Sequence, residues 1–253
     1  MAKPILVANW KNYPNSLPEA QSLLRDLKRR KLLYKKLSLF IAPPFTYFES
    51  VSRVSKGFAQ LASQNISSLP FGAYTGQITP DILKSFGVKL AIIGHSERRS
   101  FGETSEHIAH KVKVALRAGI TPLVCVGETV RDNEGEHFEL LRDQIKVSLA
   151  GLGKKEAGKI VLAYEPVWAI GKNAKEAIVP RELSQTIIFI KKVLSDLFGR
   201  ALAEKIPLLY GGSVEPENAK ILMKDSGVRG FLVGHESLKP KSFQAIALAL
   251  TSK

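Results

Sequence analysis

The sequence predicts a single α/β domain over residues 1–253, in which eight parallel strands alternate with helices and close into a barrel. Three observations indicate this fold class. Eight short apolar runs recur along the chain, each separated from the next by a segment of helix length. The runs are continuously apolar rather than alternating, which is typical of parallel strands buried on both faces. No proline–glycine linker or change of composition divides the chain, and eight such units match a closed barrel better than a doubly wound sheet.

The predicted strands end in proline, glycine or polar residues. They cover residues 5–10, 37–41, 58–62, 90–94, 122–126, 160–164, 206–210 and 230–233. The first helix is expected to start at Ser16, which can form a capping box with Glu19. Apolar residues then recur at helical spacing at Ala20, Leu23, Leu24 and Leu27. Two further helices are predicted by the stripes Ile108, Val112, Ala115 and Leu183, Ile187, Ile190, Leu194, Leu197, which end at Gly119 and Gly199.

Lysine and arginine outnumber aspartate and glutamate by 37 to 23, which gives a formal net charge of +14. Two interpretations compete: attraction of a small anionic substrate, or binding to nucleic acid. The densest basic cluster, residues 28–31 with Lys35 and Lys36, lies at the end of a predicted helix, where cations favour the helix dipole. Since no zinc-finger spacing or aromatic-interleaved basic strand occurs, we expect no nucleic acid partner.

The composition favours a reducing, cytoplasmic location. The one cysteine, Cys125, excludes an intrachain disulfide framework. No apolar run reaches membrane-spanning length, and Met1 to Trp10 lacks the apolar region of a signal peptide, so we expect no membrane association. His107 and His110 lie three residues apart on a predicted helix, but no suitable third ligand accompanies them, and we expect no metal site.

Glu165 is the residue around which the candidate site is organised. It follows the apolar run at residues 160–164, and Pro166 prevents the strand from continuing. A carboxylate at the end of a buried strand is costly unless it has a partner or a chemical role. The apolar segment at residues 167–171 can fold over a site and exclude water. Taken alone, Glu165 is more simply a salt-bridged or solvated carboxylate, so its role depends on its neighbours in the fold.

Polar residues gather just after the predicted strands: Asn9, Lys11, His95, Glu97, Glu128, Glu165, Ser213 and Gly234. In a parallel barrel these strand ends lie on one rim, so the residues converge in space. Glu165 can abstract a proton, and Lys11 and His95 can polarise a carbonyl and stabilise an enediolate. The glycine-rich turns after the last two strands, with Ser213, offer N–H groups to a phosphate. This set predicts proton transfer on a small phosphorylated carbonyl compound.

Single residues of the set have simpler alternatives. Ser213 alone would be a helix N-cap before Glu215. Glu97 alone, beside Arg98 and Arg99, would be part of a surface ion pair. Only the joint pattern favours a catalytic site over these alternatives.

At these positions the chain closely resembles the triosephosphate isomerase family along its whole length. The matching motifs are Asn9-Trp10-Lys11, Gly94-His95-Ser96-Glu97-Arg98-Arg99, Ala163-Tyr164-Glu165-Pro166-Val167-Trp168-Ala169-Ile170-Gly171 and Tyr210-Gly211-Gly212-Ser213-Val214. The resemblance implies a (β/α)8 TIM barrel that interconverts dihydroxyacetone phosphate and D-glyceraldehyde 3-phosphate. It also implies a place in glycolysis and gluconeogenesis, and no metal or organic cofactor.

The resemblance assigns a role to each residue of the site. Glu165 moves the proton between neighbouring carbons, and His95 acts as a neutral hydrogen-bond donor and proton shuttle. Lys11 and Asn9 hold the substrate oxygens, while Glu97 orients Lys11. The groups expected to bind the phosphate are Gly171, Ser213, Gly234 and His235.

The resemblance implies a homodimer that forms through the loop from Ser67 to Thr79. The matching run is residues 72–76, and the loop is long for a compact domain. It is expected to insert near Lys11 of a second subunit, with Thr75 near its tip. Gln77 stands where a glutamate is common in the family, so Arg98 is expected to lose one intersubunit ion pair.

Two further departures from the family leave alternatives open. The loop after the eighth strand has His235 and Glu236 where a second glycine and a small residue are usual, which bears on phosphate affinity. Residues 172–180 lack the usual Thr-Gly-Lys, which bears on loop closure. One alternative is a barrel specific for another sugar phosphate, favoured by His235 and Glu236. The other is a barrel retained only for binding, which the intact Lys11, His95 and Glu165 argue against.

The backbone at His235 carries a specific expectation. A positive φ would strain a non-glycine residue, so we expect a negative φ with the N–H of His235 still directed at the phosphate. The imidazole should turn towards the rim or solvent. Glu236 should point away from the phosphate, because a carboxylate in contact with the dianion would weaken binding.

Overall fold

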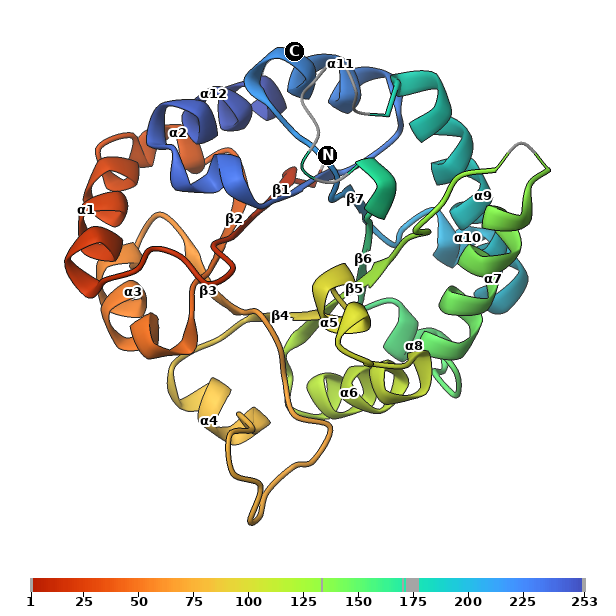
Figure 1. The fold of residues 1–253 in the computed structure, drawn as a ribbon, viewed down its shortest axis with the longest axis horizontal. Coiled ribbons are helices and arrows are strands. Elements are labelled where there is room, and N and C mark those ends of the chain that lie inside the picture. Colours follow the sequence, from red (N-terminus) through yellow and green to blue (C-terminus); the bar gives the residue numbers. More distant parts are fainter. Residues whose placement is uncertain (1, 133, 170, 172–177, 252–253) are drawn as a thin grey trace.

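A computed structural model describes residues 2–132, 134–169, 171 and 178–251. Its strands form one closed parallel barrel in sequence order, with the first strand also paired to the last (Figure 1). The strands are β1 Ile5–Asn9, β2 Ser38–Ala42, β3 Gln60–Ser63, β4 Leu90–Ile93, β5 Thr121–Val126, β6 Val161–Tyr164, β7 Leu208–Tyr210 and β8 Gly230–Val233. The predicted (β/α)8 barrel is confirmed, and each predicted strand is present with its ends shifted by no more than two residues.

Helices surround the barrel on its outside (Figure 1). The α-helices are α1 Leu17–Lys28, α2 Lys31–Tyr34, α3 Phe48–Ser55, α4 Pro80–Ser85, α5 Ser96–Ser100, α6 Ser105–Arg117, α7 Glu136–Ser148, α8 Lys154–Ala157, α9 Pro180–Phe198, α10 Arg200–Ala203, α11 Pro216–Asp225 and α12 Pro240–Thr251. Short 3-10 helices are η1 Phe45–Tyr47, η2 Val167–Ala169 and η3 His235–Leu238. None of the helices in the described part of the chain has the length and apolar character needed to cross a membrane.

The helix signals in the sequence are largely confirmed. The Ser16 hydroxyl accepts a hydrogen bond from the backbone N–H of Glu19 at 3.4 Å and caps α1, and all four residues of the predicted apolar stripe are buried. One position on α9 was predicted wrongly. Leu197 is 37% exposed, whereas Phe198 is buried, because Phe198 lies four residues after the buried Leu194 and so continues its face of the helix.

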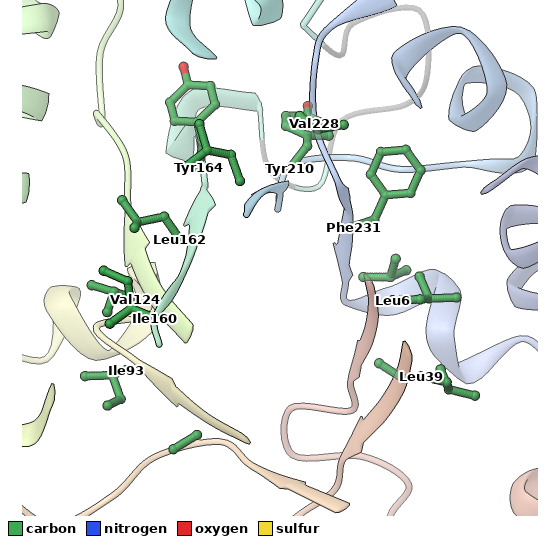
Figure 2. Packing of buried hydrophobic residues seen from close by; sticks show 14 of the residues in the cluster. Leu6, Leu39, Ile93, Val124, Ile160, Leu162, Tyr164, Tyr210, Val228 and Phe231 are labelled. Atoms are coloured by element: carbon green, nitrogen blue, oxygen red, sulfur yellow. The ribbon is translucent and has the colours of Figure 1, made fainter. Parts of the chain in front are cut away.

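The apolar core has two layers, one inside the barrel and one between the barrel and the helices. Along β6, Val161 and Ala163 belong to the inner cluster, whereas Leu162 and Tyr164 belong to the outer cluster. Figure 2 shows Leu162 and Tyr164 among the outer-cluster side chains. Because successive side chains of a strand point to opposite faces, both layers require apolar residues and the strand has a continuously apolar sequence.

Candidate active site

A cavity at the carboxyl-terminal rim of the barrel collects the predicted site residues. It is lined by Asn9, Lys11, His95, Glu165, Gly171, Ser213, Gly234 and His235, together with Gly211, Gly212 and Glu236. Each lies at or just after the end of a strand, or in the loops that follow β6, β7 and β8. Because all eight strands run in the same direction, their carboxyl ends bring these residues together from distant parts of the chain.

Glu165 lies directly after β6 and is almost fully buried, with 2% of its surface exposed. Its Oε2 accepts a hydrogen bond from the backbone N–H of Ser96 at 2.9 Å. Its Oε1 has no hydrogen-bond partner among the described residues, although His95 Nε2 lies 3.3 Å away. Gly211 permits this placement, since a Cβ there would lie 2.8 Å from the Cγ of Glu165. One carboxylate oxygen is therefore anchored and the other is available.

His95 is the N-cap residue of α5. Its Nδ1 accepts a hydrogen bond from the backbone N–H of Glu97 at 3.2 Å. A ring nitrogen that accepts carries no proton, so the imidazole is neutral in this arrangement and its proton is on Nε2. Nε2 is the nitrogen nearer Glu165. The geometry therefore supplies the neutral donor that the family resemblance implies for His95.

Lys11 has a left-handed backbone with φ of 51°, alone among the described non-glycine residues in having a positive φ. Two hydrogen bonds hold this conformation. Its N–H donates to Asn9 Oδ1 at 3.0 Å, and its carbonyl accepts from Gln64 Nε2 at 2.6 Å. Its ammonium group contacts Glu97 Oε1 at 2.5 Å, which agrees with the predicted role of Glu97. Backbone strain of this kind persists where the surroundings fix it, as at binding and catalytic sites.

The arginines after Glu97 have partners of their own. Arg98 Nε lies 3.3 Å from Glu103 Oε2. Arg99 donates to the backbone carbonyls of Gly94 and Cys125 at 2.9 and 3.0 Å. Among the described residues, Glu97 forms an ion pair with Lys11 and with neither arginine, so the alternative in which Glu97 pairs with Arg98 or Arg99 is wrong.

In the loop after β8, the expectations for the φ of His235 and for the Glu236 side chain are met. His235 begins η3, and its φ is not positive. Glu236 contacts Lys239 Nζ at 2.7 Å and the hydroxyl of Ser242 in α12. Partial desolvation acts to raise the pKa of Glu236, but the hydrogen bonds from Lys239 and Ser242 outweigh it and the pKa is lowered. The carboxylate is therefore ionised and already paired on the α12 side of the loop.

Ser213 connects the turn after β7 to the loop after β6. Its hydroxyl donates to the carbonyl of Ala169 at 2.9 Å. The N-cap of α11 is Glu215, so the simpler alternative in which Ser213 caps that helix is wrong. The sequence departure at residues 172–177 lies outside the described residues.

Two residues of the site were not predicted from the sequence as functional. Ser96 anchors Glu165 through its backbone N–H, and Gln64 supports Lys11 through its side-chain amide. The one sequence signal for Gln64 is its position just after β3, where other strands carry site residues. Ser96 acts through its backbone, which side-chain chemistry does not reveal.

A closed parallel barrel whose rim holds a buried carboxylate, a neutral imidazole and an ammonium group defines the class of barrel enzymes that move protons on carbonyl substrates. Residues 4–250 match the family model described as triosephosphate isomerase. The chain belongs to the triosephosphate isomerase family, and the family predicted from the motifs is confirmed.

Curated relatives cover nearly the full length of the chain. The protein named triosephosphate isomerase from Fusobacterium nucleatum subsp. nucleatum is 40% identical over 98% of this chain and 99% of its own. Relatives with the same name from Geobacter metallireducens and Carboxydothermus hydrogenoformans are 43% and 39% identical, each over 97% of this chain and 98% of their own. This chain is therefore similar to isomerases over its whole barrel, and it is an isomerase.

Proposed function

We propose that the protein interconverts dihydroxyacetone phosphate and D-glyceraldehyde 3-phosphate, with Glu165 as the base that transfers the proton. The observation that carries this proposal is the geometry of the Glu165 carboxylate. It is buried, one oxygen is anchored by Ser96, and the other lacks a hydrogen-bond partner in the described structure. A buried carboxylate with an available oxygen can abstract a proton from a substrate carbon that is held next to it.

The reaction needs a partner for the negative charge that develops on the substrate oxygen. When Glu165 removes the proton from the C1 carbon, the electron pair of that C–H bond forms a carbon–carbon double bond, the π pair of the carbonyl group moves onto its oxygen, and an enediolate results. The Nε2–H of His95 and the ammonium group of Lys11 both line the same cavity and can stabilise that oxygen. The hydroxyl proton of the first carbon then moves to the oxygen of the second carbon, a transfer that Nε2 of His95 can carry, and Glu165 returns its proton to the second carbon. The isomerisation is then complete without any external oxidant or reductant.

The phosphate is assigned to the glycine-rich end of the cavity. Gly171, Ser213, Gly234 and His235 line this end. Gly234 offers its N–H group, and its lack of a side chain also leaves room for Lys11, since a Cβ at Gly234 would lie 3.3 Å from the Cε of Lys11. Backbone N–H groups bind a phosphate without the ordering cost of long side chains.

A coupled isomerase assay with the purified protein tests the proposed reaction. Triose phosphates and other sugar phosphates are offered in parallel, in both directions where the coupling enzymes allow. Turnover of the two triose phosphates in preference to the others supports the proposal. Preference for another sugar phosphate would instead support the altered-specificity alternative, and binding without turnover of any substrate would support a binding protein.

The proposal includes a homodimer formed through the loop from Ser67 to Thr79. This loop, between β3 and α4, extends away from the barrel (Figure 1). It carries three exposed apolar side chains, Leu69 at 38%, Phe71 at 84% and Tyr74 at 39% exposure. Exposed apolar residues grouped on one projecting loop favour contact with another protein surface.

A cytoplasmic location and a role in glycolysis and gluconeogenesis complete the proposal. Both follow from the activity of the family to which the chain belongs. The buried, unpaired Cys125 is in keeping with a reducing compartment. Desolvation raises the pKa of its thiol well above the usual value, so this cysteine is a packing residue and not a reactive one.

A further inference from the structure

Glu236 lines the cavity next to residues that are assigned to the phosphate. A carboxylate in this position opposes phosphate binding unless its charge is offset, because like charges repel. Only 16% of its side chain is exposed, so the carboxylate is held in place by the structure around it. The proposed reaction gives Glu236 no role, and its position in the wall of the phosphate site therefore needs a physical reason.

Both carboxylate oxygens of Glu236 are engaged at the start of α12. Oε1 lies 2.7 Å from Nζ of Lys239, and Oε2 accepts a hydrogen bond from the hydroxyl of Ser242. Ser242 is in the first turn of α12, and the carbonyl of Lys239 accepts from the N–H of Phe243 in the same helix at 2.9 Å. The N-terminal end of a helix favours a negative charge, so α12 also stabilises the carboxylate. Glu236 thus joins the loop after β8 to a helix.

α12 supports this loop firmly. Its side chains Phe243, Ile246, Ala247 and Leu250 are buried. The helix packs against α11 and α1 on the outside of the barrel (Figure 1), and it also contacts η3. A helix that is held by four buried side chains moves little relative to the strands. The first turn of α12 is therefore a fixed point to which the loop after β8 can be attached.

The direction of one phosphate-binding group depends on the orientation of η3. The carbonyl of Gly234 accepts from the N–H and the hydroxyl of Ser237 at 2.9 and 2.6 Å. In a trans peptide the carbonyl and the N–H that follows it point in opposite directions, so the N–H of His235 is directed away from the interior of η3. A rotation of η3 would turn this N–H with it. Contacts that fix η3 therefore also fix where the N–H of His235 points.

We propose that Glu236 is a positioning residue for phosphate binding, whose bonds to Lys239 and Ser242 hold η3 on α12 and thereby direct the N–H of His235 into the cavity. Glu236 does not itself touch the substrate. This role rests on the proposed function in one respect, because it takes the end of the cavity beside Gly234 as the phosphate site. It goes beyond that function in assigning a task to a carboxylate that the reaction does not use.

Removal of the Glu236 carboxylate has two opposite effects on phosphate binding. It takes a negative charge out of the wall of the cavity, which favours binding, and it releases η3 from α12, which weakens binding. The first effect is small, because the ammonium group of Lys239 already offsets the charge and the hydroxyl of Ser242 donates to it as well. The second effect dominates, so phosphate should bind more weakly when Glu236 is replaced by alanine.

The test compares Glu236→Ala with the wild type in two measurements. Isothermal titration calorimetry with inorganic phosphate gives Kd without any turnover, and steady-state kinetics with D-glyceraldehyde 3-phosphate gives KM and kcat. For Glu236→Ala we expect Kd and KM to rise about three- to tenfold, as when one hydrogen bond to a charged group is weakened. The value of kcat should stay within about twofold, because the phosphate is remote from the reacting carbons and is bound alike in the ground state and the transition state.

Two further variants separate positioning from charge and from general stability. Glu236→Gln keeps the shape and one acceptor oxygen but loses the charge, and we expect Kd and KM within about twofold of the wild type. Glu139→Ala is the matched control, because Glu139 forms an ion pair of the same spacing with Arg142 on α7. It should leave Kd, KM and kcat unchanged. Tighter phosphate binding in both Glu236 variants would show that the charge dominates, and the proposal would be overturned.

Ser242→Ala is a second variant that leaves Glu236 in place, should Glu236→Ala fail to fold. It removes the donor on α12, and Kd for inorganic phosphate should rise by a smaller factor. If both substitutions act through the same hydrogen bond, the double variant should bind phosphate no more weakly than Glu236→Ala does. A wild-type Kd in either folded single variant, or fully additive losses in the double variant, would contradict the proposal.

Failure of this proposal is distinguishable from failure of the proposed function. If the wild type binds inorganic phosphate but does not turn over a triose phosphate, the proposed reaction is refuted, and the calorimetric titrations still decide the role of Glu236. If the wild type binds no inorganic phosphate, the phosphate site is refuted and the role of Glu236 with it.

Discussion

The site depends on a few residues whose individual geometry differs from what their type would prefer. Lys11 adopts a positive φ that costs free energy in a lysine, and Asn9 and Gln64 offset this cost with hydrogen bonds to its backbone. Glu165 is buried, yet only one of its oxygens has a hydrogen-bond partner in the described structure. Both arrangements are unfavourable for stability alone. They are understandable if the ammonium group and the carboxylate meet a substrate.

Replacement of Glu165 by Gln should abolish almost all turnover without unfolding the protein. The amide has nearly the same shape but cannot accept a proton, so kcat should fall by about 10²–10⁴-fold or more. Steady-state kinetics measures the loss, and circular dichroism with a thermal melt confirms the fold. A variant that retained more than about a tenth of the wild-type kcat would contradict the assignment.

Replacement of His235 by Gly should have only a small effect on the triose phosphate reaction. His235 has no positive φ to relieve, and Glu236 is already paired with Lys239, so the substitution removes no strain and frees no repulsive charge. We expect KM to change less than about tenfold, which corresponds to less than about 1.4 kcal/mol. If the variant instead gained triose phosphate turnover from near zero, or changed its preferred substrate, His235 would be a specificity determinant.

The sequence predicted the site residues whose side chains are expected to take part in the reaction. It did not predict the residues that hold those side chains or their backbone in place through hydrogen bonds from distant parts of the chain. Glu165, His95 and Lys11 were predicted because each follows a strand and matches a motif. Ser96 and Gln64 were not, because the partner of each lies far away in the chain. Their roles become visible only when the closed barrel brings the ends of β3 and β4 onto the same rim as the ends of β1 and β6.

At the scale of elements, loops and helix ends determine how the rim is presented. The loop between β3 and α4 projects from the barrel with Phe71 84% exposed, and the sequence had indicated it by its length and by the run at residues 72–76. The eight strand positions followed from hydrophobicity, but some ends did not. Phe58 and Ile206 are buried and yet precede β3 and β7, because hydrophobicity reports burial and not membership of the hydrogen-bonded ladder.

The loop from Ser67 to Thr79 should make the protein a dimer in solution. Its exposed apolar side chains need a second surface, and the family resemblance places that surface near Lys11 of a partner, with Thr75 near the tip. Gln77 should still donate or accept a neutral hydrogen bond there. Light scattering at micromolar concentration, combined with an activity measurement on the same sample, decides the question. An active monomer would refute the prediction.

The N-terminus of α7 should make stability depend on pH through Asp132. Partial desolvation acts to raise the pKa of Asp132, but hydrogen bonds from His137, Glu136 and Gly135 outweigh it and lower the pKa below the usual 3.8. A carboxyl with a lowered folded-state pKa stabilises the fold above its unfolded-state pKa, and this contribution is lost as the pH falls through the folded-state value. The stabilisation should therefore be complete at neutral pH and decline below about pH 4.

Urea denaturation of the wild type and Asp132→Asn at a series of pH values measures this effect. The difference in free energy of unfolding between the two proteins should shrink as the pH falls below about 4. Asp143→Asn is the matched control, because Asp143 is an exposed carboxylate on the same helix. A difference that stays constant down to acid pH would show that the charge of Asp132 contributes nothing.

For the whole molecule, the net charge of +14 bears on how the substrate arrives. A positive surface attracts a phosphate dianion, but near physiological salt the Debye length is only about 8 Å, so charges away from the rim are largely screened. We expect kcat/KM to fall modestly as ionic strength rises, mainly through the rim charges. Kinetics at several salt concentrations, with added viscogen to establish that diffusion limits the rate, tests this. If kcat/KM is limited by diffusion and does not change with salt concentration, electrostatic steering of the substrate is refuted.

The pairing of β1 with β8 has a consequence for biosynthesis. Ile5 is in register with Ser38 on one side and with Gly230 on the other, and Gly234 packs against Lys11 across this seam. A nascent chain can join β1 to β2 early, but the other edge of β1 waits for almost the entire polypeptide to be translated. Until then the sheet has two unpaired edges, which are prone to associate with other chains. A ribosome that stalls before Gly230 therefore leaves a fragment with two unpaired strand edges and without Gly234 and His235, two of the residues proposed to bind the phosphate.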